Sequence, residues 1–379
     1  MSILDISSTL NSSNEDDIIS LFKLIEKDPT VLSLDDKSTL VDSLLTQLMK
    51  ANWSEQTKTV GLQTLKLLGR TIEGSESLFS EKGTKVLLKM SGLDSVDTFQ
   101  DTVLAHEALK CLANCILLDE KTKLYLENNN GVANCGRLLQ IKSNYTMDVQ
   151  FLICRILFFM TVNRCDIVKQ LMDYDIAQST EKILLENVQK IKTGENLNMS
   201  APINPVSVVN EALKMLFNMM LAYGRQQQQQ QSSSSSSISA PEYFSQCLLP
   251  IFQIIFQIPP PQPLPLSPPH SHAIHALMQY PYSVILQIWR EHNNAIFNSP
   301  DLTVEQGRAF VTKKMTELLQ ESLMFLIPND DPDEQGPPDR QQYNVDAILS
   351  PIILVIRNLA HGDIHLRPLI ANALLPQQR

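Results

Sequence analysis

The chain has 379 residues and a formal net charge of −10 at pH 7, and 43% of its residues are hydrophobic. Such a chain is long and apolar enough to bury a large core, but its acidic balance argues against nucleic acid as a partner, because phosphate binding requires an excess of Lys and Arg. Only 12 residues are glycine and 6% are aromatic, so the composition favours helices.

The N-terminus, MSILDISSTLNSSNEDD, lacks the basic start and apolar core of a secretory signal peptide. No apolar stretch reaches the ~20 residues of a membrane span, because Arg155 interrupts the most apolar run, FLICRILFFMTV. None of the 6 cysteines forms a Cys-x-x-Cys pair, so we interpret them as buried, reduced thiols. The sequence therefore predicts a cytoplasmic protein without a membrane span, with the cell cortex as an alternative location.

Helical periodicity begins near the N-terminus and recurs along the chain. Apolar residues spaced three and four positions apart predict helices over 17–27, 37–50, 165–174 and 304–326. The octets EALKCLAN, which begins at Glu107, and EALKMLFN, which begins at Glu211, share six of their eight letters. A chain that contains nearly the same helix twice is typical of a repeat protein.

The last residue of each octet defines a reference position, occupied by Asn114 and Asn218. The same frame applied elsewhere ends on Arg70, Phe158, Arg290 and Asn358. The intervals 70–114 and 114–158 are both 44 residues long, which matches the armadillo/HEAT period of roughly 40–47 residues.

The later intervals are longer, and each contains segments that are polar, rich in proline or low in complexity. We expect loops or disorder in these insertions, which cover 192–206, 225–241, 258–273 and 328–343. The sequence therefore predicts an all-α fold over 1–379, a single armadillo/HEAT-type right-handed superhelical solenoid with disordered loop insertions.

The apolar residues of the repeated helix fall within an arc of about 120° on a helical wheel, whereas Glu107, Lys110 and Asn114 lie opposite. In a solenoid the equivalent helices face one concave surface, so the reference positions would form a ladder. Asparagine can pair with a peptide backbone, arginine can bind a carboxylate, and Phe158 with Phe217 can anchor apolar side chains. The alternative is that these positions are simply solvated, or, for Phe158, covered by an adjacent helix.

Recognisable catalytic chemistry is absent from the sequence. It contains no phosphate-binding, dinucleotide-binding or nucleophile-elbow motif, so we expect no enzyme, no catalytic residue and no cofactor. His270, His272 and His275 form HSHAIH, but this segment sits in a proline-rich loop with no cysteine or carboxylate nearby, and we expect no metal site. The stretch PPPQPLPLSPP is either a ligand for an SH3-type groove or a spacer, and we favour the spacer.

Several segments, taken in order, resemble synembryn, the family of exchange factors for G-protein α subunits also named after resistance to inhibitors of cholinesterase. They are EALKCLANCILLDEKTKLYLENNNGVANCGRLL, DVQFLICRILFFMTVN, EALKMLFNMML and LSPIILVIRNLAHGDIHLRPLIANALLPQQR. The resemblance covers residues 60–220 and, more loosely, 349–376. The chain is similar to a divergent, fungal-like member of that family.

The resemblance implies an armadillo/HEAT superhelix that binds a monomeric G-protein α subunit (Gα), GDP-bound or nucleotide-free, with the Gα C-terminal helix in the concave groove. It also implies nucleotide exchange and chaperoning of newly made Gα. The residues that it places in the groove are Arg70, Asn114, Arg155, Phe158, Phe217 and Asn218. Arg290 and Asn358 are candidates from the ladder alone.

Members of the family continue beyond the Leu-Leu-Pro with helices that contact the nucleotide-binding domain, so for this chain we expect binding more firmly than exchange. The alternative function is an armadillo-type peptide-binding scaffold or transport adaptor without exchange activity. Such adaptors use regular Trp and Asn pairs, whereas Trp53 and Trp289 lie in different contexts here.

Overall fold

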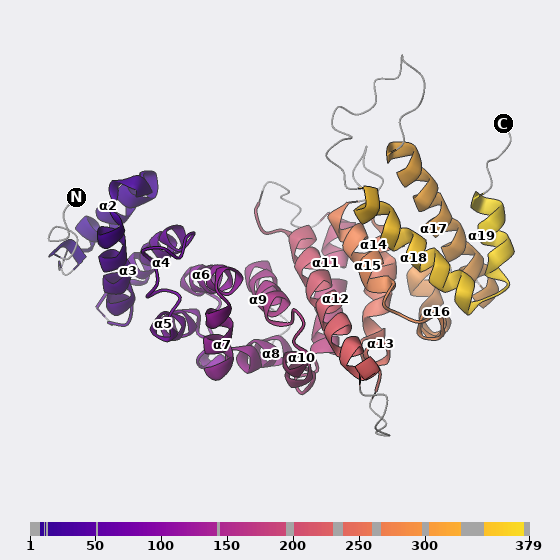
Figure 1. The fold of residues 1–379 in the computed structure, drawn as a ribbon, viewed down its shortest axis with the longest axis horizontal. Coiled ribbons are helices and arrows are strands. Elements are labelled where there is room, and N and C mark those ends of the chain that lie inside the picture. The colour runs from indigo at the N-terminus through magenta and orange to yellow at the C-terminus, as the bar shows by residue number, and fades with distance from the viewer. Residues whose placement is uncertain are drawn as a thin grey trace, which may run out of the picture. The chain divides into compact units, whose positions relative to one another are not determined.

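The computed structural model is helical, and none of the residues that it describes forms a β-strand (Figure 1). It describes residues 8–10, 12, 14–50, 52–141, 145–194, 201–229, 238–259, 267–297, 303–326 and 345–374. The predicted all-α fold is confirmed. The helices form two compact units, Met1–Ile176 and Ala177–Arg379. The single repeat domain expected over 1–379 stays a prediction.

The first unit contains helices α2 to α10. Their bounds are α2 (Glu15–Lys27), α3 (Leu34–Leu48), α4 (Glu55–Leu68), α5 (Glu81–Ser91), α6 (Val103–Leu118), α7 (Glu120–Asn128), α8 (Gly131–Ile141), α9 (Met147–Met160) and α10 (Cys165–Met172). Most of them begin after a residue whose side chain accepts a hydrogen bond from a backbone N–H two or three positions on, as Ser33, Ser54, Ser80 and Thr102 do. Such caps stabilise a helix by about 1 kcal/mol each.

Helices α4, α6 and α9 lie side by side, because α6 packs against both of the others. Helix α5 also packs against α6. On α6, the side chains of Leu109, Leu112 and Ile116 are completely buried. A central helix covered by the equivalent helices of its neighbours is the packing expected of an armadillo-type array.

The second unit contains helices α11 to α19. Their bounds are α11 (Ile176–Thr193), α12 (Pro205–Gln229), α13 (Ala240–Tyr243), α14 (Leu248–Gln257), α15 (Pro268–Leu277), α16 (Tyr282–Phe297), α17 (Val304–Leu326), α18 (Val345–Gly362) and α19 (Leu366–Leu374). Helix α15 packs against α12, α14 and α18, and α17 packs against α16, α18 and α19.

The helices extend into three of the four predicted insertions. Helix α11 runs to Thr193, α12 starts at Pro205 and continues through Gln229, and α13 starts at Ala240. Residues 268–273, assigned to a loop from their proline content, form the first turns of α15. Proline is compatible with this position, because the first N–H groups of a helix have no partner within the helix. The fourth insertion, 328–343, lies outside the described residues.

The start of α5 requires a glycine at position 83, because there is no room for a Cβ atom. A Cβ atom at this position would lie 2.2 Å from the backbone oxygen of Leu78 and 2.6 Å from that of Ser77. At Gly61, inside α4, the nearest atoms would lie at an ordinary 3.6 Å.

We therefore expect Gly83→Ala to lower the free energy of unfolding by about 1–3 kcal/mol, because a backbone segment must move. Gly61→Ala should be neutral or stabilising by up to about 1 kcal/mol, because alanine favours the helix. Urea denaturation of both variants measures the difference. Equal stabilities would contradict the close backbone approach at Gly83.

Candidate functional site

Helix α9 leaves one stripe of side chains only partly covered. Half-buried residues recur along it every three or four positions, at Phe151, Arg155, Phe158 and Phe159. The opposite side of the helix, represented by Ile153, is completely buried. Phe158 is therefore neither sealed in the core nor fully solvated, which leaves its ring able to meet a partner.

Helices α4 and α6 present equivalent stripes. Lys66 is half-buried on α4, and Arg70 is exposed just beyond the C-cap of this helix. On α6, Lys110 and Asn114 are half-buried and Leu117 is 54% exposed. Because α4 packs against α6 and α6 against α9, we expect their uncovered stripes to lie on the same side of the first unit. We call this surface the α4–α6–α9 face; it consists of Lys66, Arg70, Lys110, Asn114, Leu117, Phe151, Arg155, Phe158 and Phe159.

Arg155 lies among aromatic rings on this face. Its guanidinium carbon is 5.8 Å from the centre of the Phe151 ring and 5.5 Å from that of Phe159. The Phe159 ring is in turn 5.2 Å from the ring of Phe158. Cation–π contacts of this kind orient a guanidinium. The cluster thus combines a positive charge with an apolar surface, a combination suited to a peptide that carries both a carboxylate and aliphatic side chains.

A buried carboxylate joins α4 to α6. Glu107 is 5% exposed, and its carboxylate oxygens accept hydrogen bonds from Lys66 Nζ at 2.5 Å and Lys110 Nζ at 2.9 Å. Burial by itself would raise the pKa of Glu107, but the hydrogen bonds and charges of the two lysines outweigh it and lower that pKa. The wheel placed Glu107 on the solvated face, which is wrong, because the neighbouring helix supplies Lys66 and covers the carboxylate.

The second octet repeats this arrangement in the second unit. Glu211 is 4% exposed, and its carboxylate accepts a hydrogen bond from Lys214 Nζ at 2.9 Å. In both octets the glutamate is buried and the lysine three positions on is half-buried. The recurring Glu-Ala-Leu-Lys is thus a structural element that holds an ammonium group one turn before Asn114 or Asn218.

The uncovered stripe of α12 lies beside α15. Phe217 and Asn218 are half-buried, and the Phe217 ring meets the ring of His275 edge to face, with 6.1 Å between their centres. Nδ1 of His272 lies 3.2 Å from Oδ1 of Asn210. Burial, with the charges of Lys214 and His275, lowers the pKa of His272 to about 4. His272 is therefore neutral at pH 7.

The structure corrects the order of helices in the second unit. The repeat frame took the helix of Arg290, α16, as the successor of α12, but α15 packs against both α12 and α18. Arg290 is exposed on α16, which packs mainly against α14 and α17. Ser267 followed by Pro268 is a recognisable helix start that would have located α15.

Asn358 has an internal role in the second unit. Its side-chain nitrogen donates a hydrogen bond to the backbone oxygen of Met278, at 3.1 Å, and so ties α18 to the end of α15. Of the candidates, Arg70, Asn114, Arg155 and Phe158 belong to the first unit. Phe217 and Asn218 are adjacent on α12 in the second.

The histidines of the HSHAIH segment make hydrogen bonds within the protein. His270 is 2% exposed, and its ring nitrogens lie 2.6 Å from Ser267 Oγ and 2.7 Å from the backbone oxygen of Ile258. Within the described ranges, no three His, Cys, Asp or Glu residues are placed to hold a metal ion.

The six cysteines are free thiols, and all except Cys165 are buried. None of the described helices has the length and apolar character needed to cross a membrane.

Comparison with known proteins adds a family match. The family described as guanine nucleotide exchange factor synembryn matches residues 61–379. The chain is 24% identical to Chaperone Ric-8A of Mus musculus over 184 residues, 46% of this chain and 34% of the relative. It is 21% identical to Chaperone Ric-8A of Gallus gallus over 238 residues, 58% of this chain and 44% of the relative. The matched part is thus less than half the length of these relatives.

Solved structures share the fold. A structure from a study of a phosphorylation switch in the interaction between cadherin and beta-catenin is 10% identical, with a TM-score of 0.51 over 98% of this chain and 64% of its own. A designed armadillo repeat protein aligns over 84% of this chain and 99% of its own, at 11% identity and a TM-score of 0.47. The first of these supports the all-helical fold.

Proposed function

The chain belongs to the synembryn family, and from this premise we propose that it binds the α subunit of a heterotrimeric G protein, promotes GDP release from it and assists its folding. The observation that carries the proposal is the family match over residues 61–379. The names of the relatives, which are called chaperones, support the folding activity. The partner is monomeric Gα, GDP-bound or nucleotide-free, in the cytoplasm.

The α4–α6–α9 face is our candidate for the surface that receives the Gα C-terminal helix. Asn114 would pair with polar groups of that helix, and Arg70 and Arg155 would meet carboxylates. The rings around Arg155 and the exposed Leu117 would bury its aliphatic side chains. Phe217 and Asn218 are the corresponding candidates on α12 of the second unit. Arg290 and Asn358 stay predictions that rest on the repeat spacing alone.

Exchange by this route requires no catalytic side chain. A protein that binds nucleotide-free Gα more tightly than GDP-bound Gα must, by thermodynamic linkage, weaken GDP binding by the same factor. Holding the C-terminal helix of Gα away from its own core creates such a difference between the two states. We therefore propose a binding mechanism and no enzyme active site.

Release of a fluorescent GDP analogue from purified Gα tests the exchange activity. We expect the full chain, at saturating concentration, to accelerate release, and the Asn114→Ala/Asn218→Ala variant to accelerate it less. A parallel measurement of folded Gα recovered from cell-free synthesis tests chaperoning. Unchanged release with higher recovery would reject exchange and retain chaperoning. No effect in either assay, with peptide binding retained, would favour the scaffold or adaptor function.

A further inference from the structure

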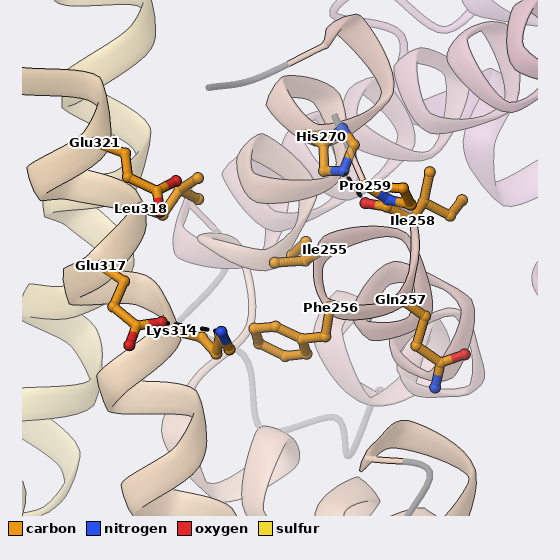
Figure 2. Close-up of a pocket in the computed structure, with 10 residues that line it drawn as sticks. All are labelled: Ile255, Phe256, Gln257, Ile258, Pro259, His270, Lys314, Glu317, Leu318 and Glu321. Carbon is orange, nitrogen blue, oxygen red and sulfur yellow. Dashed lines mark hydrogen bonds and ion pairs between the residues drawn. The ribbon is translucent and has the colours of Figure 1, made fainter. Parts of the chain in front are cut away.

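A groove in the second unit lies on helices other than α12 and has a volume of about 280 Å³. One wall is α17, and the other is formed by the end of α14, the two residues that follow it and His270 of α15. Figure 2 shows Leu318 and Glu321 on α17 directed across the groove towards Ile255 and Ile258. The groove is thus open between two walls that carry different chemistry.

The wall at the end of α14 is apolar and well supported. Ile255, Phe256 and Ile258 line it. The Phe256 ring stacks on Phe252, with 5.8 Å between ring centres, and meets the Phe310 ring edge to face at 5.9 Å. Because neighbouring rings hold the Phe256 ring on two sides, it forms a preformed contact surface. Binding of an incoming side chain would therefore lose little conformational entropy in ordering this ring.

The wall on α17 carries charge that is only partly balanced. Lys314, Glu317, Leu318 and Glu321 recur at helical spacing along it. Glu317 accepts a hydrogen bond from Lys314 Nζ at 2.9 Å. Glu321 is exposed, and none of the ion pairs within the described part of the chain includes it. Among the described residues, no cation is paired with this carboxylate, which lies at the edge of an apolar surface.

Two further features keep the groove negative. Burial lowers the pKa of His270, which leaves its ring neutral at pH 7. Helix α14 ends at Gln257, and the carbonyl end of a helix carries a partial negative charge. Lys314, the one cation that lines the groove among the described residues, is paired with Glu317.

We propose that this groove binds an arginine side chain flanked by aliphatic residues, presented by a segment of a partner protein. The volume lies just below the usual range for small-molecule pockets, roughly 300–1,000 Å³, and suits one long side chain. The guanidinium would pair with Glu321 through two hydrogen bonds, and its methylene groups would lie along Leu318. Arginine is favoured over lysine because its guanidinium is more weakly hydrated and its planar fork can bind a carboxylate through two hydrogen bonds.

A short synthetic peptide tests the groove. The probe is a capped, dye-labelled Leu-Leu-Arg-Leu-Leu with glycine-serine ends, and the matched probe carries citrulline, which has the same shape without the charge. With the full chain, fluorescence anisotropy should show about tenfold weaker binding of the citrulline peptide. Glu321→Gln should weaken binding of the arginine peptide by a similar factor, and Leu318→Ser should weaken binding of both.

Glu305→Gln is the matched control, because Glu305 is exposed on the same helix and its loss changes the net charge equally. We expect this variant to bind both peptides as the unaltered chain does. Absence of binding, equal affinity for the two peptides, or no effect of Glu321→Gln in a normally folded variant would overturn the proposal. Binding of Gα should be insensitive to Glu321→Gln, which separates this inference from the proposed function.

Discussion

Replacing both Asn114 and Asn218 with alanine is expected to weaken binding of a peptide that copies the Gα C-terminal helix by about 1–3 kcal/mol for each asparagine. The two side chains occupy equivalent, half-buried positions, each one turn after a lysine that is paired with a buried glutamate. Loss of the amide leaves a polar group of the bound peptide without a partner, and the cost of desolvating that group then counts against binding.

Titration calorimetry on the two single variants and the double variant measures this effect. Because each asparagine lies in a different unit, the single variants test the two candidate surfaces separately. Asn128→Ala, on the exposed side of α7, is the matched control and should bind normally. An unchanged affinity in the double variant, with a normal thermal unfolding curve, would place the peptide site elsewhere.

Replacing Lys66 and Lys110 together with methionine is expected to lower the free energy of unfolding at pH 7 by about 3–5 kcal/mol. The reason is that Glu107, which is 5% exposed, would lose both of the cations that compensate for its burial. Lys82→Met with Lys85→Met removes the same charge from pairs in which both partners are more than half exposed. This control should lose no more than about 1 kcal/mol per pair.

The pH dependence of the same variants gives an independent test. In the unaltered chain the pKa of Glu107 is lowered from 4.5. Its contribution to stability is therefore present above that value and is lost as the pH falls through the lower, folded-state pKa. Without the lysines, burial alone acts and raises the pKa, so protonation of Glu107 should stabilise the variant as the pH falls.

Urea denaturation between pH 7 and pH 3 measures both stability and its pH dependence. The difference in unfolding free energy between the unaltered chain and the Lys66→Met/Lys110→Met variant should narrow as the pH falls. The same difference for the Lys82→Met/Lys85→Met control should stay small throughout. If the difference in unfolding free energy for the Lys66→Met/Lys110→Met variant did not change with pH, Glu107 would not be the group that destabilises this variant.

Sequence periodicity predicted the helical repeat and the uncovered positions of the first unit well. Asn114 and Phe158 lie in the intervals of 44 residues, where one repeat follows another without an insertion. Here the sequence spacing places equivalent residues on neighbouring helices, and both are half-buried on α6 and α9. The octet beginning at Glu211 is likewise helical, within α12.

The repeat spacing did not predict the order of the helices where the intervals between reference positions were long. Between Asn218 and Asn358 the chain contains several helices, and the frame could not determine which of them packs against α12. The proline-rich composition also concealed the helix that begins at Pro268. Position along the chain determines spatial order only while each repeat has the same length, so the spacing did not predict that α15 packs against α12 or that His275 lies beside Phe217.

The amino-acid sequence by itself determined the class of fold, the period of the repeat, the asparagine positions and the family, because these depend on local periodicity and on the order of short motifs. Only the tertiary structure decided that Glu107 is buried, that α15 lies beside α12, and that Leu318 and Glu321 face Ile255 and Ile258 across a groove. The physical reason is that burial and charge compensation depend on side chains from other helices. A wheel drawn for one helix contains no information about the neighbour that covers it.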